Sequence, residues 1–402
     1  MGILEELLGN DPWEAYFIHK QDQGNLTRKE LKWLRDFIDT RAYLPVVENL
    51  LAGGTLEPPR KNLISKAYTG KKRTVYTYAP AENQVLKLIA FLLRRYDGIF
   101  CDNLYSFRSS RGVKRAAGDI LHIRDLDRRF VYKVDISNYF NSVDVSLLLP
   151  RLEKILAEDP GLFRFIKSLL ENPVAIFEER PVEEPKGVMA GVPVSTFLAN
   201  VYLMEMDARF RDRGVPYMRY SDDVIVFART EGEMADCRRE ILDFLARYRL
   251  EVNPDKEEIS PPGRSWVFLG FSYHNGVVDV SPAARDKLKA KMRRKTRALA
   301  RWAARKKLPG ERAAKAFVRR FNAKLYENPG DNELTWARWY FPVINTDRTL
   351  KELDAYMCEC IRYLATGKRT KSRFDYRYEQ IKALGFRSLV HEFYRVKEEE
   401  KA

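Results

Sequence analysis

The sequence predicts an α+β protein, and three observations lead to this prediction. Residues 1–55 have the apolar periodicity of helices. Short runs rich in β-branched and aromatic residues follow, and two of them lie next to aspartates. From residue 281 the periodicity is helical again, with a high density of lysine and arginine. Helical segments therefore flank a middle part that contains the strands.

Composition limits the classes of protein to consider. The 402 residues are enough for two or three structural units, and 45% of them are hydrophobic, which is ample for a buried core. The formal charge of +15 suggests a polyanionic partner. The four cysteines form no C-x-x-C pair, so neither a zinc knuckle nor a disulfide framework is supported.

The sequence contains no signal-peptide pattern and no apolar run long enough to span a bilayer. We therefore expect a cytoplasmic location and no membrane partner.

The N-terminal segment, residues 1–55, is predicted to be a helical extension. Asp11-Pro12 is typical of a helix start, and Thr27–Glu30 has the pattern of a capping box. Gly53-Gly54 ends the segment. Nothing in it indicates chemistry.

Residues 56–128 are expected to form strands and basic turns. The run 66–76 has the pattern of a hairpin with a cationic tip. Its tip is either a solvated loop or a clamp in which Lys71 and Arg73 bind triphosphate oxygens. Further on, residues 105–112 alternate aromatic and basic side chains, which suits stacking on bases and holding a nucleic-acid backbone. The expected contacts there are Tyr105, Arg108 and Arg111.

An acidic residue ends the strongest predicted strand, which runs from Phe130 to Ile136 and contains Asp135 near its end. A carboxylate at the end of an apolar strand is costly to desolvate unless it is paired or binds a metal. Mg²⁺ prefers hard oxygen ligands of this kind.

A second acidic site lies in Tyr220-Ser221-Asp222-Asp223, a tight polar turn between two strand-like runs, which predicts a β-hairpin. An Asp-Asp pair by itself is more often a solvated turn. If the hairpin lies beside the strand of Asp135, however, the carboxylates converge. Two Mg²⁺ ions about 3.5–4 Å apart could then support phosphoryl transfer.

The order and spacing of five motifs resemble those of reverse transcriptases, most closely the bacterial enzymes related to group II intron reverse transcriptases. The motifs are Asp135…Phe140, Gly191…Asn200, Tyr220–Asp223, Asn253–Lys256 and Phe268–Phe271. The resemblance implies a right-hand polymerase with fingers, an RRM-like antiparallel palm and a helical thumb. It places the fingers at 56–128 and 146–186, the palm at 129–145 and 187–280, and the basic thumb with C-terminal helices at 281–402.

The resemblance also implies roles for single residues. Asp135, Asp222 and the Ile136 carbonyl would be metal ligands for two Mg²⁺ ions, with Mn²⁺ as a substitute, and Asp223 would support them. Lys256 would donate a proton to the leaving pyrophosphate; the alternative is a solvated lysine near a helix end.

Two further positions concern the nucleotide. Phe140 would pack under its sugar and exclude a 2′-hydroxyl, with Tyr139 expected in the core. Gly191 would let the backbone approach a bound base. The chain departs from the usual family pattern at Ala190, Thr196 and Ser221, where Gln, Pro and Ala are common. The first of these departures puts the usual handling of template and nucleotide in doubt.

Residues 281–320 contain sixteen lysines and arginines but only two acids, Asp286 and Glu311. This density predicts a helix that follows a nucleic-acid backbone. Its centre is Arg293, Arg294 and Lys295.

The expected function is that of an RNA-directed DNA polymerase that extends a 3′-hydroxyl with deoxynucleotides. Its partners would be an RNA template, its DNA product and dNTPs. The resemblance favours a dedicated, structured non-coding RNA and a role in antiviral defence. Two alternatives stay open. One is an RNA-binding scaffold with a polymerase fold, against which the intact Asp135, Asp222 and Asp223 argue. The other is an RNA-making or template-independent polymerase, which Phe140 disfavours.

Overall fold

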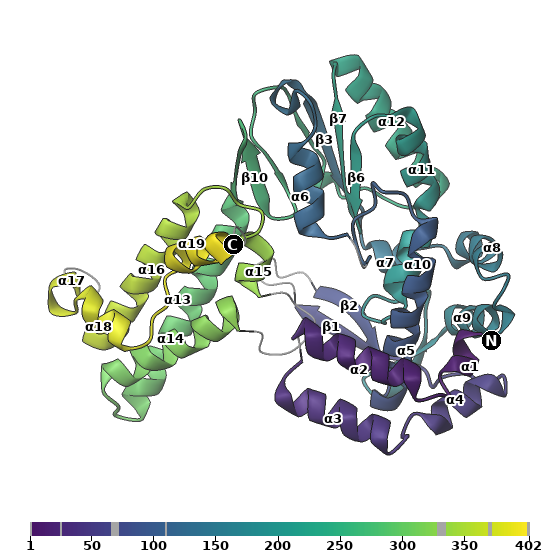
Figure 1. Ribbon diagram of the computed structural model, residues 1–402, viewed down its shortest axis with the longest axis horizontal. Helices are drawn as coiled ribbons and strands as arrows, with labels where there is room; N and C mark the ends of the chain where they lie inside the picture. The colour runs from purple at the N-terminus through teal and green to yellow at the C-terminus, as the bar shows by residue number, and fades with distance from the viewer. Residues whose placement is uncertain are drawn as a thin grey trace. The chain divides into compact units, whose positions relative to one another are not determined.

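The computed structural model describes residues 2–24, 26–65, 72–108, 111–327, 335–368 and 372–399. The chain forms two compact units. The first comprises Met1–Gln23 and Arg28–Pro262, and the second comprises Gly24–Thr27 and Gly263–Ala402. Figure 1 shows the elements of both units.

The N-terminal helices confirm the predicted helical segment. They are α1 (Ile3–Glu6), α2 (Asp11–Gln23), α3 (Arg28–Asp39) and α4 (Leu44–Leu51). The ring of Trp13 is buried and stacks on Tyr43, with 4.4 Å between ring centroids. The Ile3 amide donates to the buried carboxylate of Asp159 (2.6 Å), which connects this segment to the helix that Asp159 caps.

A four-stranded sheet joins two distant parts of the first unit. Its order is β2-β1-β4-β5. Here β1 (Arg60–Ser65) pairs antiparallel with β2 (Lys72–Thr77) and parallel with β4 (Val174–Phe177), which pairs with β5 (Arg180–Glu183). A hairpin is therefore present, but β1 lies before the predicted run 66–76 and only β2 overlaps it. The predicted tip, including Lys71, lies outside the described residues.

The expectation of strands and turns throughout 56–128 is wrong for its second half. This part contains α5 (Pro80–Leu92), the 3₁₀ segments η1 (Leu93–Ile99) and η2 (Leu126–Arg128), and α6 (Val113–Leu121). Pro80 at the first turn favours a helix, and the Glu82 carboxylate accepts from the Ala79 amide (3.3 Å). The buried face of α5 includes Val85, Leu86 and Ile89, which follow helical spacing.

A second four-stranded sheet carries the predicted acidic residues, and all of its pairs are antiparallel. Its order is β6-β7-β3-β8, where the strands are β6 (Tyr217–Tyr220), β7 (Asp223–Ala228), β3 (Phe130–Asp135) and β8 (Glu258–Ser260). The helix α12 (Glu231–Arg247) contacts β7 and β3 and buries Met234, Cys237 and Ile241 (Figure 1). The sheet is antiparallel, as the resemblance implies, and α12 packs against it.

Helices and one 3₁₀ segment connect the strands of these two sheets. They are α7 (Tyr139–Ser142), α8 (Val145–Ile155), α9 (Pro160–Glu171), α10 (Ser195–Tyr202), α11 (Met204–Arg213) and the 3₁₀ segment η3 (Pro254–Lys256). The helices α10 and α11 follow each other directly but are separate, because the chain departs from helical geometry at Leu203 (φ −108°).

The second unit begins with a three-stranded sheet of order β11-β10-β9. Its elements are β9 (Trp266–Phe268), β10 (Phe271–His274), β11 (Val277–Val280), α13 (Pro282–Arg305), α14 (Gly310–Tyr326), α15 (Trp336–Tyr340), α16 (Arg348–Thr366), α17 (Ser372–Asp375), α18 (Tyr378–Ala383) and α19 (Leu389–Glu399). The helices α13, α14 and α16 contact one another. The strands of 266–280 thus share a compact unit with the basic helices and not with the sheet of Asp135.

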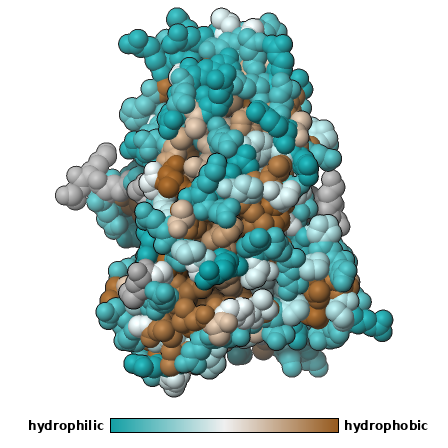
Figure 2. Space-filling model, turned by 90° about the vertical axis from the view of Figure 1, so that its right-hand side faces the viewer, coloured by the Kyte–Doolittle hydropathy of each residue, from teal (hydrophilic) through white to brown (hydrophobic). Residues whose placement is uncertain are grey.

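In the described part of the chain, no helix combines the length and the apolar character that a membrane span requires. Figure 2 shows a face that is mainly hydrophilic in its upper part and has hydrophobic patches in its middle and lower parts. Large side chains of the first unit that remain exposed include Trp33 (45%) and Phe107 (47%).

Candidate active site

Three aspartates meet at one end of the β6-β7-β3-β8 sheet. Asp135 is the last residue of β3, and its register partner on the neighbouring strand is Asp223, the first residue of β7. Asp222 lies in the two-residue turn between β6 and β7. The Ile136 amide donates to the Asp222 carbonyl (3.0 Å), so the end of β3 and the turn are bonded directly.

Burial and repulsion by neighbouring acids make Asp222 and Asp223 reluctant to ionise. Burial, with the charge of Asp135 as the second cause, raises the pKa of Asp222. Burial and the charges of Asp222 and Asp135 raise the pKa of Asp223 to about 7. A cation placed among these groups would relieve both effects.

Lys256 supplies one positive charge to this cluster. Its ammonium donates to Asp135 Oδ2 (2.5 Å), and the side-chain amide of Asn253 donates to Asp135 Oδ1 (3.3 Å). Burial lowers the pKa of Lys256, but the hydrogen bond and the charge of Asp135 outweigh burial and raise it above its ordinary value. The 3₁₀ segment η3 thus brings Lys256 to the carboxylates, as its predicted role requires.

The turn that carries Asp222 is held by the buried side chain of Ser106. Ser221 has φ +61°, a left-handed conformation that is uncommon for a residue other than glycine. Its amide donates to the hydroxyl oxygen of Ser106 (2.8 Å). Ser106 is 0% exposed and is fixed in turn by Asn200, whose side-chain amide donates to the Ser106 carbonyl (3.0 Å).

An ion pair lies behind the same turn. Arg219 Nε donates to Asp207 Oδ1 (2.8 Å), and its side chain and that of Asp207 are 0% and 1% exposed. Arg219 also donates to the Ser221 carbonyl (3.3 Å), and the Tyr217 hydroxyl donates to Asp207 (2.9 Å). This pair is not among the residues predicted from the sequence. Its only signal there is an arginine on the strand before the acidic turn.

The stretch 105–112 has another role than the one predicted for two of its residues. The Tyr105 ring is only 4% exposed, and its hydroxyl donates to Asp119 (2.7 Å), so in this structure it cannot stack on a base. Arg108 donates to the main-chain carbonyls of residues 97, 101 and 104. These hydrogen bonds use the groups that would hold a phosphate.

Arg111 is also held by acidic side chains. It forms ion pairs with Asp102 and Asp119, and 15% of its side chain is exposed. The main chain around 103–105 pairs with Arg219 as a short extra strand at the edge of β6. This stretch therefore supports the acidic turn.

Comparison with known families identifies the architecture. Residues 62–273, more than half of the chain, match the family model described as "Reverse transcriptase (RNA-dependent DNA polymerase)". The chain belongs to the reverse transcriptase family. The predicted fold class, an α+β right-hand polymerase, is confirmed.

Solved structures of two telomerases are similar to this reverse transcriptase. The apo telomerase of Candida tropicalis, truncated from its C-terminal domain, is 15% identical, with a TM-score of 0.44 and coverage of 56% of each chain. The telomerase of Candida albicans, in complex with a fragment of telomeric RNA, is 12% identical, with a TM-score of 0.44 and coverage of 83% of this chain and 62% of the other. The chain thus spans less than two thirds of either telomerase. None of the curated proteins compared with it matches.

In this reverse transcriptase the first of the two aromatic residues after Asp135 lies in the core, as the sequence predicts, and the role of the second stays a prediction. Tyr139 is 2% exposed, and its hydroxyl donates to the Ala199 carbonyl (2.5 Å). Phe140 is half-buried, and the ring of Phe107 meets it edge-on, with 6.3 Å between centroids and an interplanar angle of 81°. Phe140 remains a candidate for the residue that excludes a 2′-hydroxyl on the incoming nucleotide, a role called the sugar gate below.

Gly191 is required by the packing of the protein itself. It has φ +98°, and a Cβ there would lie 3.0 Å from the Tyr76 carbonyl oxygen of β2. The neighbouring Ala190 is bonded through its main chain: its amide donates to Asn141 Oδ1 (2.9 Å), and its carbonyl accepts from the Tyr76 amide (2.8 Å). These backbone bonds fix the loop, and they do not depend on the glutamine that is common at 190.

The predicted triphosphate clamp is described only in part. Arg73 lies on β2 opposite Ile64 and is exposed. Lys71 is outside the described residues.

The donor set at the carboxylates fits a divalent metal ion, which reverse transcriptase domains generally use. Among the described residues, no three His, Cys, Asp or Glu side chains are already arranged as a metal cluster. Asp135, which is buried, and Asp222, which is half-buried, nevertheless offer hard oxygen donors close enough for the charge of Asp135 to raise the pKa of Asp222. These two aspartates and the Ile136 carbonyl are the groups that would hold the ions.

The predicted basic segment, residues 281–320, forms α13 and the beginning of α14 in the second unit, and its centre lies on α13. Arg293 and Arg294 are exposed on it and Lys295 is half-buried, whereas Leu288, Met292 and Leu299 face the interior. The cations thus lie on the outer faces of the helix, as predicted.

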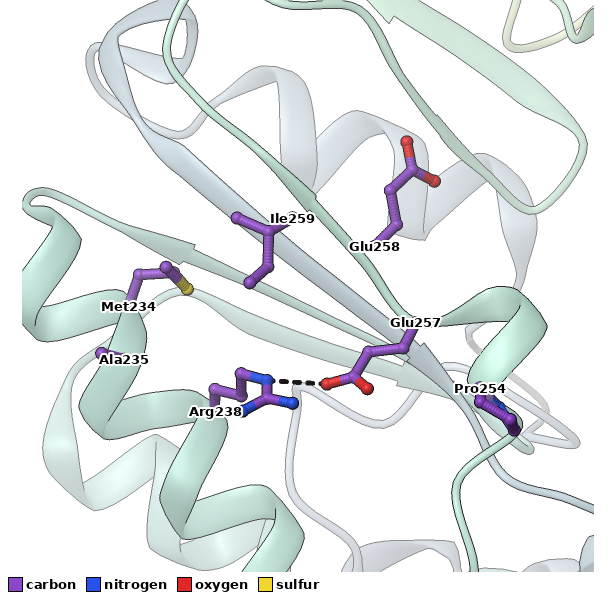
Figure 3. Close-up of a pocket in the computed structure, with 7 residues that line it drawn as sticks. All are labelled: Met234, Ala235, Arg238, Pro254, Glu257, Glu258 and Ile259. Atoms are coloured by element: carbon purple, nitrogen blue, oxygen red, sulfur yellow. Dashed lines mark hydrogen bonds and ion pairs between the residues drawn. The ribbon is translucent and has the colours of Figure 1, made fainter.

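A groove beside the β6-β7-β3-β8 sheet is lined by other residues than the three aspartates. Figure 3 shows it between α12 and the segment that contains β8, where Arg238 Nε donates to Glu257 Oε1 (2.7 Å). The same oxygen accepts from the Tyr132 hydroxyl (3.0 Å). The described residues that line the groove include no predicted site residue.

Proposed function

We propose that this reverse transcriptase is an active RNA-directed DNA polymerase that extends a 3′-hydroxyl with deoxynucleotides. The observation that carries the proposal is the pairing of Asp135 with Asp223 across adjacent strands, with Asp222 in the adjoining turn. A scaffold that only bound RNA would have no need for acidic side chains so close that their charges raise the pKa of Asp222 and of Asp223.

We assign one role to each of the residues that meet at this end of the β6-β7-β3-β8 sheet. Asp135, Asp222 and the Ile136 carbonyl would hold two Mg²⁺ ions, and Asp223 would support them. When bound, the ions lower the pKa of the attacking hydroxyl and stabilise charge on the leaving oxygen. Lys256, whose raised pKa keeps it protonated at neutral pH, holds a proton for the leaving pyrophosphate.

The experiment is primer extension with a matched pair of variants. The parent protein should extend a DNA primer on an RNA template in the presence of Mg²⁺ and stop when a chelator is added. Asp222→Asn keeps the size of the side chain but removes its charge, so extension should fall by several orders of magnitude while RNA binding is retained.

Asp212→Asn is the control, because Asp212 is an exposed acid that forms an ion pair with its neighbour Arg211, which is exposed as well. It should extend primers as the parent does. Equal extension by Asp222→Asn and the parent would refute the assignment of Asp222 as a metal ligand.

We also propose a finer placement: a bacterial enzyme of the group II intron type that copies one structured non-coding RNA in antiviral defence. The order of its motifs and the basic faces of α13 support this idea. Purification after expression with the native flanking DNA, followed by sequencing of bound RNA, tests it. One dominant transcript from the neighbouring locus would support it, whereas a random sample of cellular RNA would contradict it.

A further inference from the structure

The side chain of Phe107 is exposed in a conformation that the protein must enforce. Its backbone has φ +58°, a region that is unfavourable for a bulky residue. Even so, 47% of the residue is accessible to solvent. Asparagine or glycine would adopt this conformation more readily, and burial of the ring does not offset the strain.

Two anchors hold the conformation, one on each side of Phe107. Ser106 precedes it, is 0% exposed and bonds to Ser221 and Asn200. Arg108 follows it and donates to three main-chain carbonyls, of which the closest is that of residue 101 (2.8 Å). The backbone of Phe107 is therefore held on both sides.

The ring lies next to the proposed active site. It meets Phe140 edge-on. The anchor Ser106 accepts a hydrogen bond from Ser221, which directly precedes Asp222. Phe107 thus directly follows the serine that holds the turn of Asp222, and its ring contacts Phe140, the candidate sugar gate.

We infer that Phe107 is a stacking surface for a nucleobase at the active site, a role that rests on the proposed polymerase function. An exposed aromatic face is a sequence-tolerant partner for any base, since every base has a π-face. The base can come from two sources, the template strand or the incoming deoxynucleotide. Tyr105, the residue of this stretch that the sequence predicts to stack, is buried.

The test measures stacking without catalysis, by fluorescence quenching of 2-aminopurine. In one arm the analogue is the templating base of an RNA annealed to a DNA primer. In the other it is a deoxynucleoside triphosphate added to a primer–template with a chain-terminated 3′ end. The variant Phe107→Asn removes the ring and still tolerates positive φ, and Phe107→Tyr keeps the ring.

We expect the parent and Phe107→Tyr to quench the analogue in one arm, and that arm identifies the source of the base. Phe107→Asn should abolish the quenching and bind the same ligand about 5- to 100-fold more weakly, as is typical when the stacking of one base is removed. Trp33→Ala, which removes an equally exposed ring from α3, should leave both arms unchanged.

Two outcomes would overturn the inference. One is equal quenching and affinity for Phe107→Asn and the parent in both arms. The other is a loss of binding by Phe107→Tyr as large as that of Phe107→Asn, because the ring would then not be the cause. Quenching that depends on Phe107 in a parent that extends no primer would contradict the polymerase function but leave this site standing.

Discussion

The guanidinium of Arg219 and the carboxylate of Asp207 form an ion pair that solvent does not reach, with 2.8 Å between Nε and Oδ1. Asp207 belongs to α11 and Arg219 to β6, so the pair joins a helix to the strand that leads into the acidic turn. Because Arg219 also donates to the Ser221 carbonyl, the pair holds the turn directly.

Removing one partner of this pair should destabilise the first unit strongly. Arg219→Leu leaves a buried carboxylate without its counter-charge, which typically costs about 3–5 kcal/mol of unfolding free energy. Chemical denaturation of parent and variant measures the difference. Arg60→Gln is the control, because Arg60 and Glu179 form an ion pair that is 67% and 77% exposed. A destabilisation no larger than that of the control would show that the pair does not hold the fold.

The sugar gate predicts a change in nucleotide choice. Phe140→Ala opens space beneath the nucleotide C2′, so ribonucleotide incorporation should rise relative to deoxynucleotide incorporation. Affinity for RNA should change little. Single-nucleotide extension with each triphosphate gives the ratio, and Phe140→Tyr, which keeps a ring, should resemble the parent. If the parent already uses both sugars equally well, Phe140 is not a gate.

The outer face of α13 should account for part of the salt dependence of RNA binding. Replacing Arg293, Arg294 and Lys295 by Gln should flatten the slope of log affinity against log salt by roughly 0.7–0.9 for each phosphate that the variant no longer neutralises. Binding titrations at several salt concentrations measure the slope.

The control for α13 replaces three arginines of the first unit that already pair with acids, Arg209, Arg211 and Arg239. This triple Gln variant should keep the parental slope. If the α13 variant keeps the parental slope, the nucleic acid does not bind along this face of α13.

Glu392 should make the second unit sensitive to acid. A hydrogen bond from Arg387, together with one from Arg395, outweighs burial and lowers the pKa of Glu392 to about 2. The folded state therefore favours the ionised form, and this stabilisation is present above pH 4.5 and is lost as the pH falls toward 2. Thermal unfolding of Glu392→Gln should show a lower midpoint than the parent at neutral pH and a smaller difference at pH 3. An identical difference at both pH values would contradict the assignment.

Local sequence determined the features that depend on neighbouring residues. The strand that ends in Asp135 and the hairpin of Asp222 and Asp223 are present because β-branched runs and a two-residue polar turn specify them over a few residues. The amphipathic spacing of α12 and α13 likewise determined which of their faces are buried. The family motifs then indicated that these pieces belong together.

Tertiary structure alone decided how the acidic turn is supported. Tyr105 and Arg108 have the composition of a nucleic-acid contact, but carbonyl and carboxylate groups that the fold brings beside them bond to their polar atoms. Ser106 and Asn200 are 94 positions apart, and nothing in the sequence indicates that they bond to each other. A buried polar group must find a partner wherever the fold places one. That partner is set by long-range packing, which the order of residues along the chain does not display.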